Sequence, residues 1–164
     1  MLYLLSLQRA GVLQMSADDF KEWPLDLSPV QVDDHGRLFI SPVIHNWDIV
    51  TERGINTVVD LEGGLDIGVP TVPDQCLYIY FPIYDEALPN LDKLHAITSL
   101  CAALVTAEHR VLSHCGMGFN RSALVAALTL HKLGMPGPEV VTRLRNRRPG
   151  ALFNNRFAAF LEAL

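Results

Sequence analysis

Cysteine, positive charge and long apolar runs are all scarce in this sequence, and each shortage excludes a class of protein. The three cysteines are an odd number without paired spacing, so they form neither a disulfide framework nor a cysteine-based zinc pattern. Because the chain has 13 basic and 18 acidic residues, its net charge of −5 gives no general attraction to nucleic acid or to an acidic membrane. With 164 residues, 49% of them apolar, it is long enough for one globular domain with a sizeable core.

The apolar N-terminal segment, residues 1–15, lacks the pattern of a signal peptide or a membrane span. It has no basic start, Arg9 interrupts it, and no small-residue cleavage site follows it. It is also shorter than the ~20 residues that cross a bilayer as a helix. We interpret residues 1–29 as an N-terminal extension that packs on the domain, and residues 30–164 as the domain itself.

Short apolar strands alternate with helices along the chain. Runs rich in β-branched and aromatic residues, ended by Pro or Gly, predict strands over 37–41, 55–61, 77–81 and 111–114. Apolar residues at helical spacing predict helices over 45–53, 91–109, 122–133, 139–147 and 154–164. This alternation predicts an α/β fold with a central, mostly parallel sheet flanked by helices. In such a sheet a ligand binds outside the carboxyl ends of the strands.

The most informative stretch, residues 114–122, reads His-Cys-Gly-Met-Gly-Phe-Asn-Arg-Ser and joins a predicted strand to an apolar helix. Such a loop can curl around one phosphate, because its N–H groups point inward and the helix N-terminus adds positive charge. We predict that Arg121 binds the phosphate with the preceding loop residues, which are Gly116, Met117, Gly118, Phe119 and Asn120.

Cys115 is the predicted nucleophile of this loop. A nearby helix N-terminus and a ring of N–H groups favour the reactive thiolate form of a cysteine. Arg121 can hold two phosphate oxygens with its planar fork and stabilise charge in the transition state. Ser122 can donate a hydrogen bond to the sulfur when it leaves, and His114 is expected to orient the loop through a hydrogen bond.

An acid is also required, because an alkoxide or phenoxide is a poor leaving group. Asp85 follows the strand at 77–81, in a loop of turn-forming residues, and is our candidate. The same carboxylate would then activate water to hydrolyse the phosphocysteine. The neighbouring Glu86 is the alternative acid, and the structural alternative is that Asp85 only caps a turn.

Residues 114–122 resemble, at every specified position, the signature His-Cys-x-x-Gly-x-x-Arg-Ser/Thr of cysteine-dependent protein tyrosine phosphatases. This resemblance extends to the dual-specificity phosphatases through the segments 38–42 and 54–61 and through Arg148-Pro149, Asn154 and Phe157. The chain has Phe153 where that family often has Pro. The resemblance implies a phosphotyrosine-phosphatase-like sandwich and a phosphatase that needs no cofactor and no metal. It also implies that Asn154 hydrogen-bonds the phosphate loop.

The loop sequence does not specify one substrate. The resemblance implies phosphorylated proteins, both phosphotyrosine and phosphoserine/threonine, and the uncharged loop disfavours a polyphosphoinositide. A working thiolate needs a reducing compartment, so we expect a cytoplasmic protein. We expect it to bind neither membrane nor nucleic acid, in keeping with its negative net charge.

Two other functions stay open. Gly-Phe-Asn-Arg also resembles the loop of RNA 5′-triphosphatases, for which a rim could come from Arg143, Arg145, Arg147 and Arg148. The negative charge and Asp85 argue against that reading. A non-catalytic phosphate-binding module would be expected to lack the cysteine, the arginine or the acid, and this chain has all three. Cys101 is interpreted as a core residue, and neither it nor Cys76 is assigned a redox role.

Overall fold

The structure is a computed structural model that describes residues 28–164, so residues 1–27 of the predicted N-terminal extension lie outside the described range. The described chain contains a five-stranded sheet with the order β1-β2-β5-β3-β4. The strands are β1 (Val30–Gln31), β2 (Leu38–Ser41), β3 (Thr57–Asp60), β4 (Leu77–Tyr80) and β5 (Val111–His114). Strand β1 is antiparallel to β2, and the other neighbours are parallel. The predicted mostly parallel α/β sheet is confirmed.

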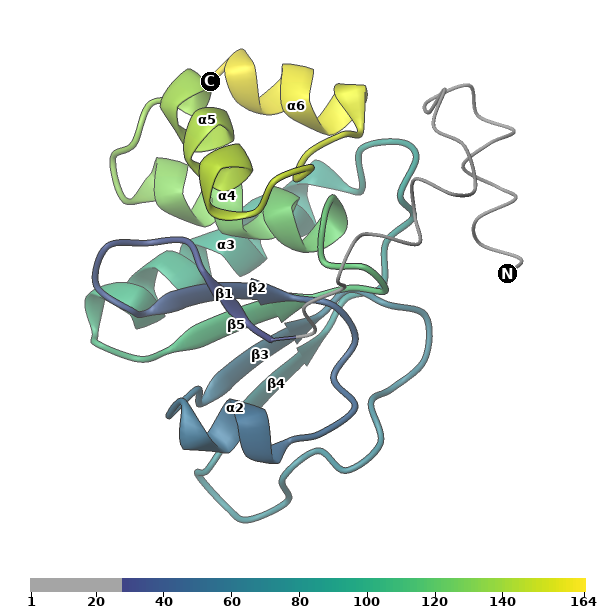
Figure 1. Ribbon diagram of the computed structural model, residues 1–164, viewed down its shortest axis with the longest axis vertical. Helices are drawn as coiled ribbons and strands as arrows, with labels where there is room; N and C mark the ends of the chain where they lie inside the picture. Colours follow the sequence, from purple (N-terminus) through teal and green to yellow (C-terminus); the bar gives the residue numbers. More distant parts are fainter. Residues whose placement is uncertain (1–27) are drawn as a thin grey trace.

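Helices cover both faces of this sheet (Figure 1). Within residues 28–164 they are α2 (Asp48–Glu52), α3 (Leu91–Thr106), α4 (Arg121–Lys132), α5 (Gly137–Arg147) and α6 (Asn155–Glu162). Helix α2 lies on one face, and α4 lies on the other with α3, α5 and α6 around it (Figure 1). The predicted sandwich of helices on a central sheet is therefore present.

Helix α4 forms the centre of the larger core. Every residue from Arg121 to Leu130 is buried, as expected for a helix that is apolar on nearly all sides. The helix packs against the sheet and against α3, α5 and α6, where Leu94, Leu144 and Phe157 join it in one apolar cluster. A smaller cluster under α2 contains Trp47. This burial fixes the N-terminus of α4 against the sheet edge.

The parallel register brings functional positions together. Strand β5 lies between β2 and β3, and its last residue, His114, is paired with Ser41 on one side and with Asp60 on the other. The carboxyl ends of parallel strands lie at one edge, so the segments that follow β2, β3, β4 and β5 meet there. Strand β4 is the outer strand of the parallel part, and its residues are partly exposed.

Several boundaries differ from the sequence predictions. Strand β1 was not predicted, because two residues are too short to show an alternating pattern. The turn after it is shaped by the Asp33 carboxylate, which accepts hydrogen bonds from the N–H groups of residues 35, 37 and 38. Helix α2 begins at Asp48, whose N–H is bound by Asn46 Oδ1 at 2.8 Å. Helix α3 ends at Thr106, since Glu108 has a φ of 70°. Among the helices of residues 28–164, none is long and apolar enough for a membrane crossing.

Candidate active site

Cys115 begins the loop that joins β5 to α4, and it is 2% exposed. Its Sγ accepts a hydrogen bond from the N–H of Gly118 at 3.3 Å and lies 3.5 Å from Ser122 Oγ. The Oγ of Ser113 donates to the Ser122 carbonyl at 2.9 Å, which ties the end of β5 to the first turn of α4. The sulfur is therefore held at the base of a curled loop, next to a helix N-terminus.

Two glycines in this loop lie where a side chain would collide with neighbouring atoms. Gly118 has a φ of 70°, and a Cβ there would lie 2.5 Å from the Ser41 carbonyl carbon. At Gly116 a Cβ would lie 2.6 Å from Glu62 Oε2. Any side chain at Gly118 would therefore meet both an unfavourable backbone conformation and the backbone of β2.

Arg121 is almost fully buried, and acceptors from two neighbouring loops hold its guanidinium. Its Nη1 donates to the carbonyls of Leu61 at 3.1 Å and Ile83 at 3.3 Å, and its Nη2 donates to Glu62 Oε2 at 2.8 Å. Sequence reasoning did not single out Glu62, although its place directly after a buried strand was an available signal.

The Glu62 carboxylate remains ionised beside this arginine. Burial is the largest single influence on its pKa and raises it, but the hydrogen bond and charge of Arg121, with N–H groups of Gly63 and Gly116, outweigh burial and lower the pKa. Glu62 thus binds the same two groups, the guanidinium and a loop N–H, that would bind a phosphate oxygen.

Asp85 lies in the same pocket as Cys115, and two amides hold its carboxylate. Asn120 Nδ2 donates to Oδ2 at 2.9 Å, and Asn154 Nδ2 donates to Oδ1 at 3.2 Å. The Asn154 backbone N–H also donates to Asn120 Oδ1 at 3.0 Å, so Asn154 contacts the loop. Glu86, the alternative acid, accepts a hydrogen bond from Asn154 through its backbone carbonyl and does not line this pocket.

Arg148 braces the loop from behind. Its Nη2 donates to the Met117 carbonyl at 3.1 Å, and its guanidinium carbon lies 4.4 Å from the centre of the Phe119 ring. Arg143 and Arg147, by contrast, form ion pairs with Asp34. None of the four arginines that could form a basic rim for RNA, residues 143, 145, 147 and 148, lines the pocket that contains Cys115.

The pocket above Cys115 is narrow. Its volume is about 10 Å³, the space of roughly one water molecule. Its walls are Asp85, Cys115, Met117, Phe119, Asn120, Arg121 and Phe153.

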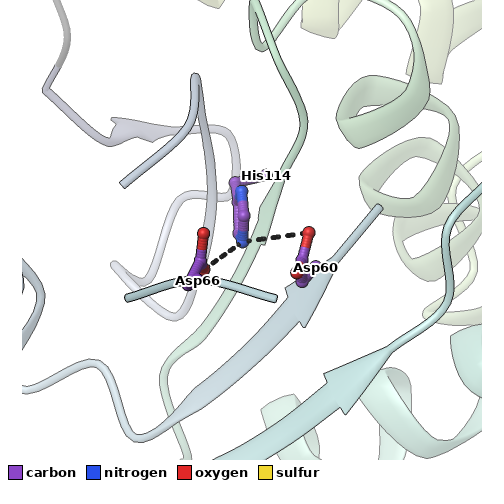
Figure 2. A group of neighbouring side chains, drawn as sticks. All are labelled: Asp60, Asp66 and His114. Carbon is purple, nitrogen blue, oxygen red and sulfur yellow. Dashed lines mark ion pairs between the residues drawn. The ribbon is translucent and has the colours of Figure 1, made fainter. Parts of the chain in front are cut away.

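His114 makes contacts that differ from the prediction. It is fully buried, and its Nε2 lies 2.8 Å from Asp66 Oδ2 and 3.5 Å from Asp60 Oδ1 (Figure 2). Neither ring nitrogen makes a hydrogen bond within residues 28–164, so the expected hydrogen bond to the loop is absent there. The reason is that the ring of the last β5 residue is placed beside β3 and the loop after it. Burial raises the pKa of Asp60, although its hydrogen bond from Tyr78 opposes this.

The other two cysteines lie outside the pocket. Cys101 is buried in α3, as predicted for a core residue, and burial raises its pKa to about 11. Burial also raises the pKa of the half-buried Cys76. Both thiols are therefore less reactive than an ordinary cysteine.

Solved structures of phosphatases and of a phosphatase-like protein share this architecture. Tk-PTP in its active form is 26% identical, with a TM-score of 0.64 over 86% of this chain and 98% of that one. Human DUSP28 is 20% identical, with a TM-score of 0.66 over 82% and 93%. The human tyrosine phosphatase-like serine/threonine/tyrosine-interacting protein is 17% identical, with a TM-score of 0.67 over 84% and 95%.

No protein-family model matches the sequence, and no curated protein matches it. The likeness is therefore one of three-dimensional structure, and it extends over most of the described chain. The resemblance first seen in residues 114–122 is confirmed at the level of the fold, which this chain shares with dual-specificity phosphatases.

Proposed function

We propose that this protein is a cysteine-dependent phosphatase that hydrolyses phosphomonoesters in proteins. The observation that carries the proposal is the placement of Cys115, Arg121 and Asp85 around one pocket at the carboxyl edge of the sheet. The neighbouring folds are those of phosphatases, which supports the same class of reaction.

In the first step Cys115 attacks the phosphorus, and the bond from phosphorus to the substrate oxygen breaks. Asp85 gives its proton to that oxygen, so a neutral alcohol or phenol leaves. Arg121 and the N–H groups of the loop bind the phosphoryl oxygens as charge spreads over them. Asn120 and Asn154 hold the Asp85 carboxyl group toward the pocket.

In the second step water attacks the phosphocysteine and the sulfur leaves as a thiolate. Asp85, now a carboxylate, removes a proton from that water. Ser122 Oγ, 3.5 Å from the sulfur, can donate a hydrogen bond to the thiolate. Inorganic phosphate is the product, and the enzyme returns to its starting protonation state.

The proposed substrates are phosphotyrosine and phosphoserine/threonine in proteins. The loop residues 116–120 are uncharged, so they offer no additional cation for a second phosphate group. An RNA 5′-triphosphate has less support, because Arg143 and Arg147 pair with Asp34 and Arg148 braces the loop. Because a reactive thiolate needs a reducing environment, we propose that the protein acts in the cytoplasm.

The test is release of phosphate from p-nitrophenyl phosphate in the presence of a chelator, over a pH series. We expect the wild type to be active, Cys115→Ser to be inactive, and Asp85→Asn to lose the basic limb of the profile. General acid catalysis contributes about 10²- to 10⁴-fold, which sets the expected loss in Asp85→Asn on substrates with poor leaving groups. Asp74→Asn, an exposed loop acid, is the control and should match the wild type.

Phosphopeptides and a 5′-triphosphorylated RNA then separate the substrate classes. Activity on phosphotyrosine and phosphoserine peptides supports the proposal. A wild type that is inactive on all monoesters but releases phosphate from the RNA would replace it with the triphosphatase function.

A further inference from the structure

Three buried side chains, one of them directly before Cys115 in the chain, form a cluster that the proposed reaction does not use. Asp60 is the last residue of β3, His114 is the last residue of β5, and Asp66 lies in the loop after β3 (Figure 2). The side chains of Asp60 and His114 are fully buried, and that of Asp66 is 4% exposed. One donor atom from each residue lies within 4.8 Å of the other two.

The two carboxylates need a positive partner, and His114 Nε2 is the group that lies close to both of them. A neutral imidazole would leave two negative charges together in a buried place, which is costly. A protonated His114 would form ion pairs with both carboxylates, at 2.8 Å to Asp66 Oδ2 and 3.5 Å to Asp60 Oδ1, but Nε2 makes a hydrogen bond to neither of them. Figure 2 shows Nε2 at the end of the ring that faces both carboxylates.

The spacing of the three donor atoms suits a metal ion. Ligands bound to one Zn²⁺ at about 2.0–2.2 Å stand roughly 3–3.5 Å apart at right-angled to tetrahedral geometry. His114 Nε2 lies 2.8 Å from Asp66 Oδ2 and 3.5 Å from Asp60 Oδ1. A divalent ion would also balance the two carboxylate charges while the imidazole stays neutral.

A surrounding shell of hydrogen bonds orients the ligands. Tyr78 Oη donates to Asp60 Oδ2 at 2.5 Å, and the Glu62 N–H donates to Asp60 Oδ1 at 2.8 Å. The Asp66 N–H donates to Tyr78 Oη at 3.2 Å, so one tyrosine connects both acids. Such outer contacts are typical of metal sites, where they fix the ligand orientation.

We propose that Asp60, Asp66 and His114 bind one divalent transition-metal ion, with Zn²⁺ preferred. An imidazole ligand favours Zn²⁺ over Mg²⁺ or Ca²⁺, whose sites are built from oxygen. The ion takes no part in the phosphatase reaction. It connects β3, the following loop and the end of β5 that precedes Cys115, and thereby holds the loop of Asp66 against the sheet. Exposed glycines on both sides of Asp66, Gly64 and Gly68, allow that loop to lift and admit the ion.

The test uses the tag-free Cys115→Ser chain, so that the active-site thiol cannot bind zinc. After removal of metals, ZnCl₂ is titrated by calorimetry and the bound ion is counted by native mass spectrometry. We expect one equivalent of Zn²⁺ and a higher melting temperature. Loss of an outer-shell partner weakens metal sites about 10- to 100-fold, so Asp66→Asn, which removes a ligand, should weaken binding at least tenfold. Asp74→Asn in the same background is the matched control and should bind as the parent does.

Two further measurements guard against a variant that misfolds. Circular dichroism of metal-free Asp66→Asn should equal that of the parent. The imidazole ¹⁵N resonances should show a zinc-dependent shift at one histidine in the parent, and Asp66→Asn should need at least ten times more zinc to show the same shift. Equal zinc affinity in the parent and in folded Asp66→Asn, or no uptake by the parent, would overturn the proposal. Because the chain tested is catalytically dead, either result leaves the proposed phosphatase activity untouched.

Discussion

Replacing Gly118 by alanine tests how closely strand β2 shapes the phosphate loop. With a φ of 70°, a Cβ at this position would lie 2.5 Å from the Ser41 carbonyl carbon and 2.6 Å from Pro42 N. The left-handed backbone costs a non-glycine residue roughly 1–2 kcal/mol. Overpacking against a fixed backbone adds about 1–3 kcal/mol. We therefore expect Gly118→Ala to lower the free energy of unfolding by about 2–5 kcal/mol.

Gly36→Ala separates the two contributions. Gly36 has a φ of 71°, but the nearest atom to a Cβ there is a side-chain oxygen of Gln31 at 3.7 Å, an ordinary contact. This variant should lose only the backbone contribution, about 1–2 kcal/mol. Urea denaturation of both variants and of the wild type measures the difference.

Activity provides the second readout for Gly118→Ala. If the loop relieves the contact by moving away from Ser41, its N–H groups no longer converge on the phosphate, and kcat/KM for p-nitrophenyl phosphate should fall at least tenfold, while Gly36→Ala keeps wild-type activity. A Gly118→Ala variant that is as stable as Gly36→Ala and fully active would refute the reasoning about how this loop is held.

Asn154→Ala should lower kcat on phosphoserine more than on p-nitrophenyl phosphate, because the candidate acid that Asn154 holds matters most for poor leaving groups. Asn90→Ala is the control, since it removes another helix N-cap and should lose only about 1 kcal/mol of stability. Arg148→Met should lose about 2–4 kcal/mol in thermal or urea unfolding, from its charged hydrogen bond and its contact with an aromatic ring. In timed alkylation at pH 8, Cys101 should react far more slowly than Cys115, because a pKa of about 11 leaves about one thiol in a thousand ionised; equal rates would contradict this.

The buried Cys101 thiol also makes the stability of the protein depend on pH. A thiol whose pKa is raised in the folded state favours folding most below its ordinary pKa, and this contribution is lost as the pH rises toward about 11. The difference in unfolding free energy between the wild type and Cys101→Ala should therefore change between neutral pH and pH 10. A difference that stays constant over this range would contradict the prediction.

Much of the fold was predictable because the relevant signals are local. Strand β5 and helix α4 have strong apolar patterns ended by turn residues, and both occur within one residue of the predicted ranges. The two-residue β1 has no such pattern, since its pairing depends on the turn that Asp33 stabilises. The early end of α3 depends on one residue, Glu108, in a left-handed conformation.

The sequence by itself determined the chemistry of the loop, because Cys115, the glycines and Arg121 lie within seven consecutive residues whose spacing is set by covalent bonds. Only the tertiary structure decided the groups that surround it. Glu62 reaches Arg121, Asn154 reaches Asp85, and Asp66 reaches His114 across long stretches of chain. Parallel pairing brings the ends of β3 and β5 to one edge, and that proximity depends on how the sheet and α4 pack, which no local pattern contains.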